Sequence, residues 1–438
     1  MKHYLLLIGG VLLSLCSCQR PASVPANQGL NEVVAILMPQ DSSEAEGSGS
    51  MFGFINNGNY LGALQDLVRN EASILAQFPP DMYYQSLGTA LSKVGEYYTV
   101  LEAWNKQADR QADSVRQEDI ELFLGHLELA DAVEEIVAAA SERQVVMINE
   151  AHHVPLHRVF TRSLLKDLYD QGYRYLAAET LRHSEIANLN ETKIPGFRNG
   201  VYVSEPQYAN LLREALDLGY ELVAYEDQHD FNYSQRDSSQ ARNLAAVFAR
   251  DPEAKMLVHA GYAHIYETTG SEWIKMGQYF QAFTGIDPLT INQTDLTEKG
   301  KPEAESPYYQ PILEHYQPTE PKVIRIEGSY WILPNSSGLV DMQIIHPQTR
   351  MLRGRPNWVQ TDNQEIRILA NKLNGVLLAQ VFEAEELAQR EASQLIPVDQ
   401  IIVKNPRQEH SLFVPPNGAY VVRLLNRDNE VVEQYKVQ

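Results

Sequence analysis

The chain has 438 residues, 44% of them hydrophobic, so it is long enough for more than one domain and for sizeable cores. Its 36 Lys and Arg against 57 Asp and Glu give a formal net charge of -21 at pH 7. This charge argues against nucleic acids and anionic membrane surfaces as partners.

The first 18 residues are typical of an export signal. Lys2 and His3 precede an apolar segment, residues 4–15, that is short for a transmembrane span. The ending Leu15-Cys16-Ser17-Cys18 resembles a bacterial lipoprotein signal, which implies lipid attachment at Cys18 and a cell-envelope location, facing the periplasm or outside. An ordinary signal peptide is the alternative. Both cysteines of the chain lie here, so the mature chain has no Cys-based catalysis, Cys-ligated metal or disulfide.

The next two segments differ in composition. Residues 19–50 are rich in Pro, Ser, Asn, Gly and Glu and are expected to form a tether. Helix formers dominate residues 51–140, where a set of spaced residues resembles a tetratricopeptide helical hairpin: Tyr84, Leu87, Gly88, Leu91, Gly95 and Tyr97. A pair similar to Gly95 and Tyr97 lies 37 residues earlier in the chain. Because this offset is longer than a tetratricopeptide repeat, we expect a helical hairpin or a small helical bundle.

Residues 141–350 alternate between strand-like runs and helix-period segments. The strand-like runs are residues 145–148, 173–178, 220–225 and 255–258, and the helices between them are expected at 156–169, 205–218 and 235–250. A further helix is expected at 273–283 and further strands at 289–293, 323–326 and 342–345. This alternation predicts an α/β fold with a mostly parallel sheet and flanking helices.

The last segment, residues 363–438, reads as a small β-rich region. A helical stretch is expected first, followed by strands at 400–404, 411–414, 419–425 and 431–436. The clusters Pro-Pro-Asn-Gly and Asn-Arg-Asp-Asn between the last strands are typical of turns. This region contains no cluster of reactive groups.

Polar, titratable residues follow all four strands of the predicted parallel sheet. They are Glu150 and His152 after the first strand, Glu179 after the second, Glu226 and Asp227 after the third, and His259 and His264 at the fourth, with Gly261 between them. Because the carboxyl ends of parallel strands meet at one edge, we expect these residues to share a crevice.

Two kinds of chemistry fit this set of side chains. A Ser nucleophile is not indicated, since no Gly-x-Ser-x-Gly elbow is present. One scheme is a divalent metal held by His152, His264 and a carboxylate, which activates water. The other is a His base that activates water directly, oriented by Glu150 or Glu179, with an Arg that stabilises the oxyanion. The sequence leaves both schemes open.

These residues resemble the motifs of the erythromycin esterase-like superfamily, which includes ChaN-like haem-binding lipoproteins and TIKI/TraB-type proteins. The matches are Asn149-Glu150-Ala151-His152 for Gly-Glu-x-His, then Glu179, Glu205-Pro206, Arg236-Asp237 and Gly261-Tyr262-Ala263-His264, over about residues 140–345. The chain departs from the pattern at Asn149, where the family has Gly.

The resemblance implies a catalytic site of Glu150, His152, Glu179, Arg236 and His264. In the esterase branch the water-activating base would be His152, and in TIKI-type members His152 and His264 would bind a divalent metal. His153, Glu226, Asp237 and His259 are expected to support these groups.

The sequence thus predicts an envelope lipoprotein that hydrolyses an ester or amide, with a small-molecule or peptide substrate and membrane contact only through its lipid. The alternative is a ChaN-like protein that binds haem without catalysis.

Overall fold

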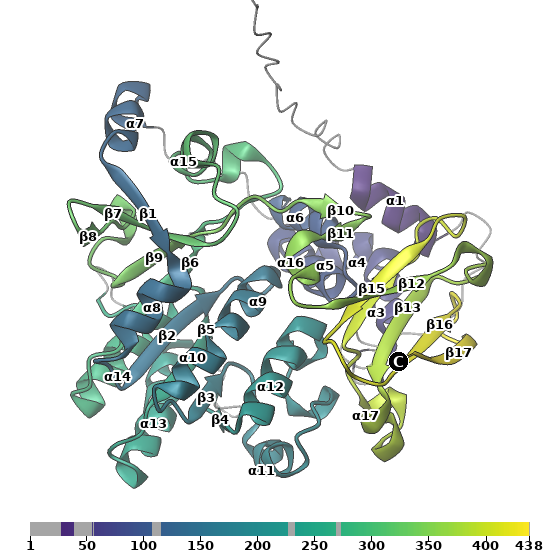
Figure 1. Ribbon diagram of the computed structural model, residues 1–438. Coiled ribbons are helices and arrows are strands. Elements are labelled where there is room, and N and C mark those ends of the chain that lie inside the picture. Colours follow the sequence, from purple (N-terminus) through teal and green to yellow (C-terminus); the bar gives the residue numbers. More distant parts are fainter. Residues whose placement is uncertain are drawn as a thin grey trace, which may run out of the picture.

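The computed structural model describes residues 28–38, 55, 57–106, 115–226, 233–268 and 273–437. Its centre is a sheet formed by β1 (Leu127–Asp131), β2 (Val145–Glu150), β3 (Tyr175–Ala178), β4 (Glu221–Ala224), β5 (Met256–Gly261), β6 (Leu289–Leu296), β7 (Lys322–Ile326), β8 (Ser329–Tyr330) and β9 (Met342–Ile345). The strand order is β1-β7-β9-β6-β2-β5-β3-β4, and β8 pairs with β7 (Figure 1).

Most neighbours in this sheet are parallel. The pairs β2–β5, β2–β6, β3–β5, β3–β4 and β6–β9 are parallel, and the pairs of β7 with β1, β8 and β9 are antiparallel. The predicted α/β fold with a mostly parallel sheet is therefore confirmed. Strand β1 was not predicted, because it lies in a segment dominated by helix formers and gains its strand partners only from β7, almost 200 residues later in the chain.

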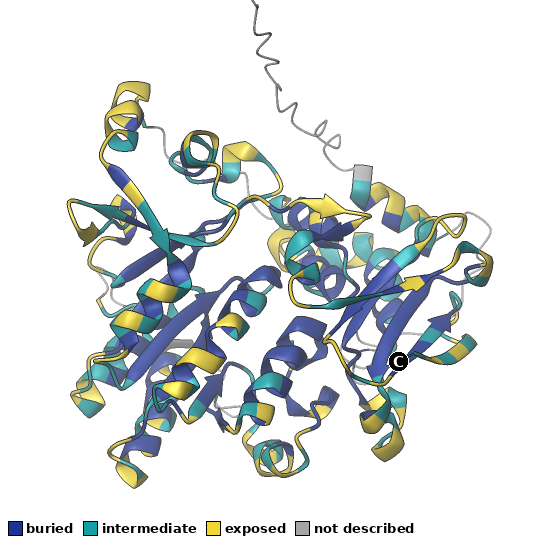
Figure 2. Cartoon of the chain, in the orientation of Figure 1, coloured by how far each residue is buried: buried dark blue, intermediate teal, exposed yellow. Residues whose placement is uncertain are grey.

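Helices cover both faces of this sheet. The first face carries α8 (Ala132–Ala140), α9 (Leu156–Ser163), α10 (Leu165–Asp170) and α12 (Pro206–Leu218), and the second carries α13 (Tyr233–Arg250) and α14 (Met276–Thr284). Alternate residues of β2 serve the two faces: Val146 and Ile148 join the first core, and Val145 and Met147 join the second. Figure 2 shows the sheet as buried and the outer sides of these helices as exposed.

The described N-terminal residues are helical. They form α1 (Gln28–Leu37), α3 (Tyr60–Arg69), α4 (Glu71–Gln77), α5 (Pro80–Ser92), α6 (Tyr97–Asn105) and α7 (Gln117–Leu124). Helix α1 lies within the segment expected to be a tether, and its Val33 and Leu37 are buried in the same core as the first face of the sheet. Within the described ranges, we find no helix with both the length and the apolar character needed to span a membrane.

The C-terminal region is built from antiparallel strands. It contains β10 (Met351–Leu352), β11 (Arg355–Pro356), α16 (Asn357–Gln360), β12 (Gln364–Ile368), β13 (Leu378–Glu383), α17 (Ala384–Gln389), β14 (Asp399–Ile402), β15 (His410–Val414), β16 (Tyr420–Leu425) and β17 (Val431–Val437). One sheet has the order β14-β13-β16-β17, and β12 pairs with β15. The helical stretch expected after residue 363 is therefore only partly helical: it contains α17 but also β12 and β13, because pairing with β15 and β16 outweighs the helix propensity of these residues.

Helices α9 and α12 stand between the large sheet and the C-terminal strands (Figure 1). Arg213 of α12 donates to both carboxylate oxygens of Glu386 at 2.7 and 2.8 Å, and the side chain of Asn210 donates to the carbonyl of Val398 at 2.9 Å. These contacts hold the C-terminal region against α12. The first turn of the same helix faces the sheet edge described next.

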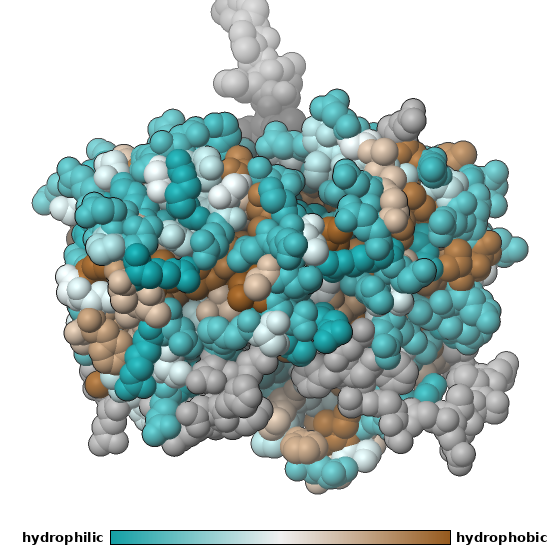
Figure 3. Space-filling model, turned by 90° about the horizontal axis from the view of Figure 1, so that it is seen from below, coloured by the Kyte–Doolittle hydropathy of each residue, from teal (hydrophilic) through white to brown (hydrophobic). Residues whose placement is uncertain are grey.

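Two further helices complete the described chain, α11 (His183–Thr192) and α15 (Tyr309–Tyr316). On the face shown in Figure 3, hydrophilic side chains predominate among the described residues, and apolar ones form scattered groups. Scattered apolar side chains are ordinary on protein surfaces.

Candidate functional site

The ends of the four predicted strands meet at one edge of the sheet. Glu150 at the end of β2 lies opposite Gly261 at the end of β5, and Ala178 at the end of β3 lies opposite His259. Glu179 follows β3 directly, and Glu226 lies two residues after β4. The parallel register therefore collects these side chains in one place, as the alignment of strand ends predicted.

Glu150 is the buried centre of the site. Its two carboxylate oxygens accept from Arg158 Nε at 2.7 Å and Nη2 at 2.9 Å, and they lie 2.9 Å from His152 Nδ1 and His259 Nε2. Burial alone would raise the pKa of Glu150, but Arg158, His259 and His152 hold it well below its usual value. Glu150 is therefore an ionised acceptor that fixes the rings around it.

His152 is oriented by Glu150 and by two aromatic rings. Because ionised Glu150 accepts from Nδ1, the hydrogen-bond pattern assigns the proton of a neutral imidazole to Nδ1 and leaves the lone pair on Nε2. Tyr202 stacks on the ring with centroids 4.2 Å apart, and Tyr262 meets it edge-on at 5.1 Å. The basic nitrogen Nε2 then lies 4.0 Å from Glu179 Oε1.

Glycine at position 261 is required by this arrangement. A Cβ on Gly261 would stand 2.2 Å from Cε1 and 2.5 Å from Nε2 of His152, closer than any real contact. The Gly261 N–H also donates a short hydrogen bond to Glu179. Gly261 thus lets the His152 ring approach the sheet edge and holds the neighbouring carboxylate.

Glu179 and Glu226 hold Arg236 from two sides. Arg236 Nη2 donates to Glu179 Oε1 at 2.6 Å, and Nε and Nη2 each donate to Glu226 at 2.7 Å. Burial would raise the pKa of Glu179, but the neighbouring His152, His264 and Arg236 lower it to about 2. Glu226, expected from the sequence to support the site, does so through its ion pair with Arg236.

His264 is linked to Arg236 and Asp237, which lie near the start of α13. Arg236 Nη1 lies 3.1 Å from His264 Nε2, and Asp237 Oδ1 lies 2.5 Å from Nδ1. The same Asp237 oxygen accepts from the backbone N–H of Met276 at 2.9 Å. Asp237 thereby fixes the His264 ring, and His264 fixes the guanidinium of Arg236.

The site has a buried floor and an accessible rim. Glu150, Arg158 and His259 form the floor, with side chains at most 1% exposed. The rim consists of His152, His264 and Arg236, whose side chains are 13%, 17% and 27% exposed. A ligand therefore meets two imidazoles and a guanidinium above a sealed ionic network.

Helix α12 supports the floor at its first turn. Glu205 is its N-cap and accepts from the backbone N–H groups of Gln207 and Tyr208, and it also accepts from Arg158 Nη1 at 2.9 Å. Tyr208 donates to the carbonyl of Glu179 at 2.5 Å. One helix end therefore supports both site carboxylates.

Asn149, the residue that departs from the family pattern, points away from the rim. Its side chain accepts from the backbone N–H of Gln293 at 2.8 Å and donates to the carbonyl of Tyr262 at 2.9 Å. It therefore joins β2 to β6 and to the turn after β5. That turn begins with Tyr262 at a φ of 44°.

The remaining predicted histidines have supporting positions. His153 is buried and stacks on Trp104 of α6 with centroids 3.5 Å apart, and burial holds its pKa well below the usual value. His259 lies in the floor between Glu150 and Thr161. Cys18 and the whole predicted signal, together with Asp227, lie outside the described residues.

Arg158 is the main site residue that the sequence did not indicate. It lies in the first turn of α9, where an arginine is usually exposed to solvent. The apolar periodicity of that helix does not distinguish it from the other polar residues. Tyr202 and Tyr208 were also missed, because tyrosines are too common in this chain to stand out. Glu205 was noticed only as part of a Glu-Pro pair, and its N-cap position before Pro206 was the available signal.

The donor set does not fit a metal held by His152 and His264 in this arrangement. Both ring nitrogens of His264 already face protein groups, and no set of three or more metal-ligating side chains is gathered within the described part of the chain. Haem fits poorly at His152, since Nε2 faces the buried Glu179 carboxylate and Tyr202 covers the ring.

Comparison with known proteins leaves the family open. No protein-family model and no curated protein matches the chain. Among solved structures, the chain is similar to the type III effector HopBA1 (15% identity, 39% of this chain and 86% of that chain, TM-score 0.28). It is also similar to a structure described as bacterial protein toxins (15% identity, 55% of this chain and 56% of that chain, TM-score 0.31). A third similar structure is RRSP, a MARTX toxin effector domain from Vibrio vulnificus (19% identity, 50% of this chain and 45% of that chain, TM-score 0.27). The chain spans about half the length of the last two, and TM-scores this low do not establish a shared fold.

Proposed function

We propose that the protein is a hydrolase that cleaves an ester or amide with water activated at His152. The observation that carries the proposal is the hydrogen bond from His152 Nδ1 to buried, ionised Glu150, which leaves Nε2 as a base at the accessible rim. The motif resemblance to erythromycin esterase-like proteins supports the same assignment.

The 4.0 Å between His152 Nε2 and Glu179 Oε1 suits a water molecule that donates one hydrogen to each acceptor. In the reaction, this water attacks the substrate carbonyl carbon and its proton passes to Nε2. When the tetrahedral intermediate collapses, the bond to the alkoxide or amine breaks and the leaving group takes the proton from Nε2. Glu150 remains ionised throughout and stabilises the imidazolium.

Arg236 is the candidate for stabilising the oxyanion. Its Nε and Nη2 hydrogens are used by Glu226 and Glu179, and Nη1 uses one of its two hydrogens on His264. The other Nη1 hydrogen has no partner among the described residues and is available to a carbonyl oxygen. His264 is then a positioning residue that aims this group.

The envelope location belongs to the same proposal. The lipoprotein-like signal at residues 1–18 would tether the enzyme to a bacterial membrane through Cys18, with the α/β domain facing the periplasm or outside. Its substrate would be a small molecule or peptide of that compartment.

The test is a panel of ester and amide substrates with the purified protein, run with and without a chelator after metal analysis. We expect turnover that survives chelation and that His152→Ala abolishes. Replacement of His126 by Ala is the matched control, because His126 is an exposed residue just before β1 and takes part in none of the site contacts described above. Turnover that is unchanged in His152→Ala refutes the proposal, whereas activity lost together with a bound metal selects the metal scheme. A Soret shift on haem titration would favour the haem-binding alternative.

A further inference from the structure

A second hollow of about 830 Å³ lies apart from the candidate site. Its walls come from α6, the hairpin of β10 and β11, β12, the end of β14 and the loop before β15, where the N-terminal helices meet the C-terminal strands (Figure 1). None of its lining residues belongs to the floor or rim described above. The volume is in the range of small-molecule sites, which is about 300–1,000 Å³.

Arg355 in the wall of this hollow has unused hydrogen-bond donors. Its side chain is 5% exposed, and Nη2 donates to the two oxygens of Asp399 at 2.6 and 2.8 Å. Nε and Nη1 are buried and have no partner among the described groups. A buried donor left without an acceptor costs about 1–3 kcal/mol, so an incoming acceptor would be favoured here.

Gly95 packs closely against Arg355 in this wall. This glycine lines the same hollow, and a Cβ on it would stand 3.4 Å from Arg355 Nη1 and 2.7 Å from the carbonyl of Gln400. Its φ of 75° also favours glycine. Glycine at this position thus lets the turn before α6 pack against β14 and brings its backbone next to Arg355 Nη1, and both residues line the hollow.

Two more guanidinium groups lie at the mouth. Arg353 Nη1 and Arg367 Nε both donate to Glu365, and the two side chains are 66% and 54% exposed. The Ser411 hydroxyl and these two arginines hold the pKa of Glu365 at about 2, so this carboxylate stays ionised and engaged. The other terminal nitrogens of both arginines keep donors for a ligand.

The charge of the lining also admits an anion. Four cationic residues are matched by four glutamates, in a chain whose acidic residues outnumber the basic ones by 57 to 36. Of those glutamates, Glu365 is paired with the two arginines and Glu96 with Lys404 at 2.6 Å. The lining is therefore balanced in charge, unlike the protein as a whole, and Asp399 behind it pairs with the buried Arg355.

We propose that this hollow is a binding site for a small organic anion. The carboxylate or phosphate of the ligand would accept from Arg355, Arg353 and Arg367, in the geometry that guanidinium groups favour. Its apolar part would lie on Tyr98 and Met351, which line the hollow and are 36% and 38% exposed.

The proposal is tested by isothermal titration of the purified full-length protein with citrate and, separately, with pyrophosphate at constant ionic strength. We expect saturable binding of at least one anion at one site. The double variant Arg353→Ala/Arg367→Ala should weaken it at least tenfold without a change in fold. Arg355→Lys, which keeps a charge beside Asp399 but removes the unused donors, should weaken it as well. Tighter citrate binding points to a carboxylate ligand and tighter pyrophosphate binding to a phosphate.

The matched control is Arg407→Ala, an exposed arginine on the loop before β15 that does not line the hollow. It should bind like the wild type, and so should His152→Gln, since the two sites share no residue. No saturable binding of either anion overturns the proposal. So does equal binding by the wild type and the double variant, or an equal loss in Arg407→Ala.

Discussion

Replacement of Arg158 by Met is expected to destabilise the protein strongly. Arg158 donates to Glu150 at 2.7 and 2.9 Å, to Glu205 at 2.9 Å and to the carbonyl of His152 at 2.9 Å, and its side chain is 1% exposed. Removing it leaves the two buried carboxylates of Glu150 and Glu205 without their guanidinium partner. Breaking one buried pair in this way typically costs about 3–5 kcal/mol.

The pH dependence of this loss follows from Glu150. Its folded-state pKa is depressed, so its contribution to stability is present above its unfolded pKa and is lost as the pH falls toward the folded value. The free-energy difference between wild type and Arg158→Met should therefore be largest near pH 7 and should shrink below about pH 4.5.

The assay is urea unfolding at pH 7 and pH 4, followed by circular dichroism. A triple variant that also carries Glu150→Gln and Glu205→Gln has no unpaired charge, and we expect it to recover at least half of the loss at pH 7. Arg116→Met, which breaks an exposed pair on α7, should leave the unfolding midpoint unchanged. A loss below about 1 kcal/mol in Arg158→Met, or a triple variant no more stable than the single one, would refute this reasoning.

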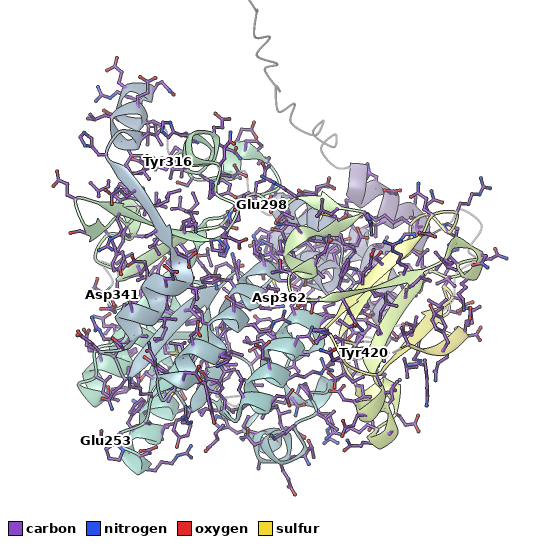
Figure 4. All side chains as sticks on the ribbon, in the orientation of Figure 1. Glu253, Glu298, Tyr316, Asp341, Asp362 and Tyr420 are labelled. Atoms are coloured by element: carbon purple, nitrogen blue, oxygen red, sulfur yellow. The ribbon has the colours of Figure 1, made fainter. Side chains whose placement is uncertain are left out.

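Three further changes test other parts of the structure. Burial raises the pKa of Glu298 (labelled in Figure 4) to about 7, so its charge opposes folding as the pH rises, and Glu298→Gln should gain about 2–3 kcal/mol over wild type at pH 8 but not at pH 5 in urea unfolding. Gly261→Ala should abolish turnover, because its Cβ would displace the His152 ring, whereas Gly125→Ala, at the residue just after α7, should keep it; an active Gly261→Ala enzyme contradicts the site geometry. Asn149→Gly should lose about 1–2 kcal/mol, since the backbone N–H of Gln293 and the carbonyl of Tyr262 lose their partner, and an unchanged thermal midpoint would show that these bonds add nothing.

The large sheet could be predicted because its signals are local. Each apolar run of residues 145–148, 173–178, 220–225 and 255–258 is a strand, and Gly219 ends α12 with a φ of 100° as expected for a C-terminal glycine. Parallel topology alone then brings the carboxyl ends of these strands to one edge of the sheet. For this reason Glu150, Glu179 and His259 could be placed together from the sequence.

The parts that could not be predicted depend on partners far along the chain. Strand β1 forms because β7 pairs with it, and β12 and β13 form because β15 and β16 pair with them. Arg158 belongs to the site because the N-cap of α12 and the end of β2 converge on it. No pattern within one segment contains that information.

The most direct test of the account is the kcat/KM of His152→Gln on the best substrate of the panel, compared with His126→Gln. Glutamine keeps polarity and a similar size but has no basic nitrogen. A general base contributes about 10²–10⁴-fold, so we expect a loss in that range for His152→Gln and none for the control. A kcat/KM within about threefold of wild type, far less than a base supplies, would contradict water activation at His152.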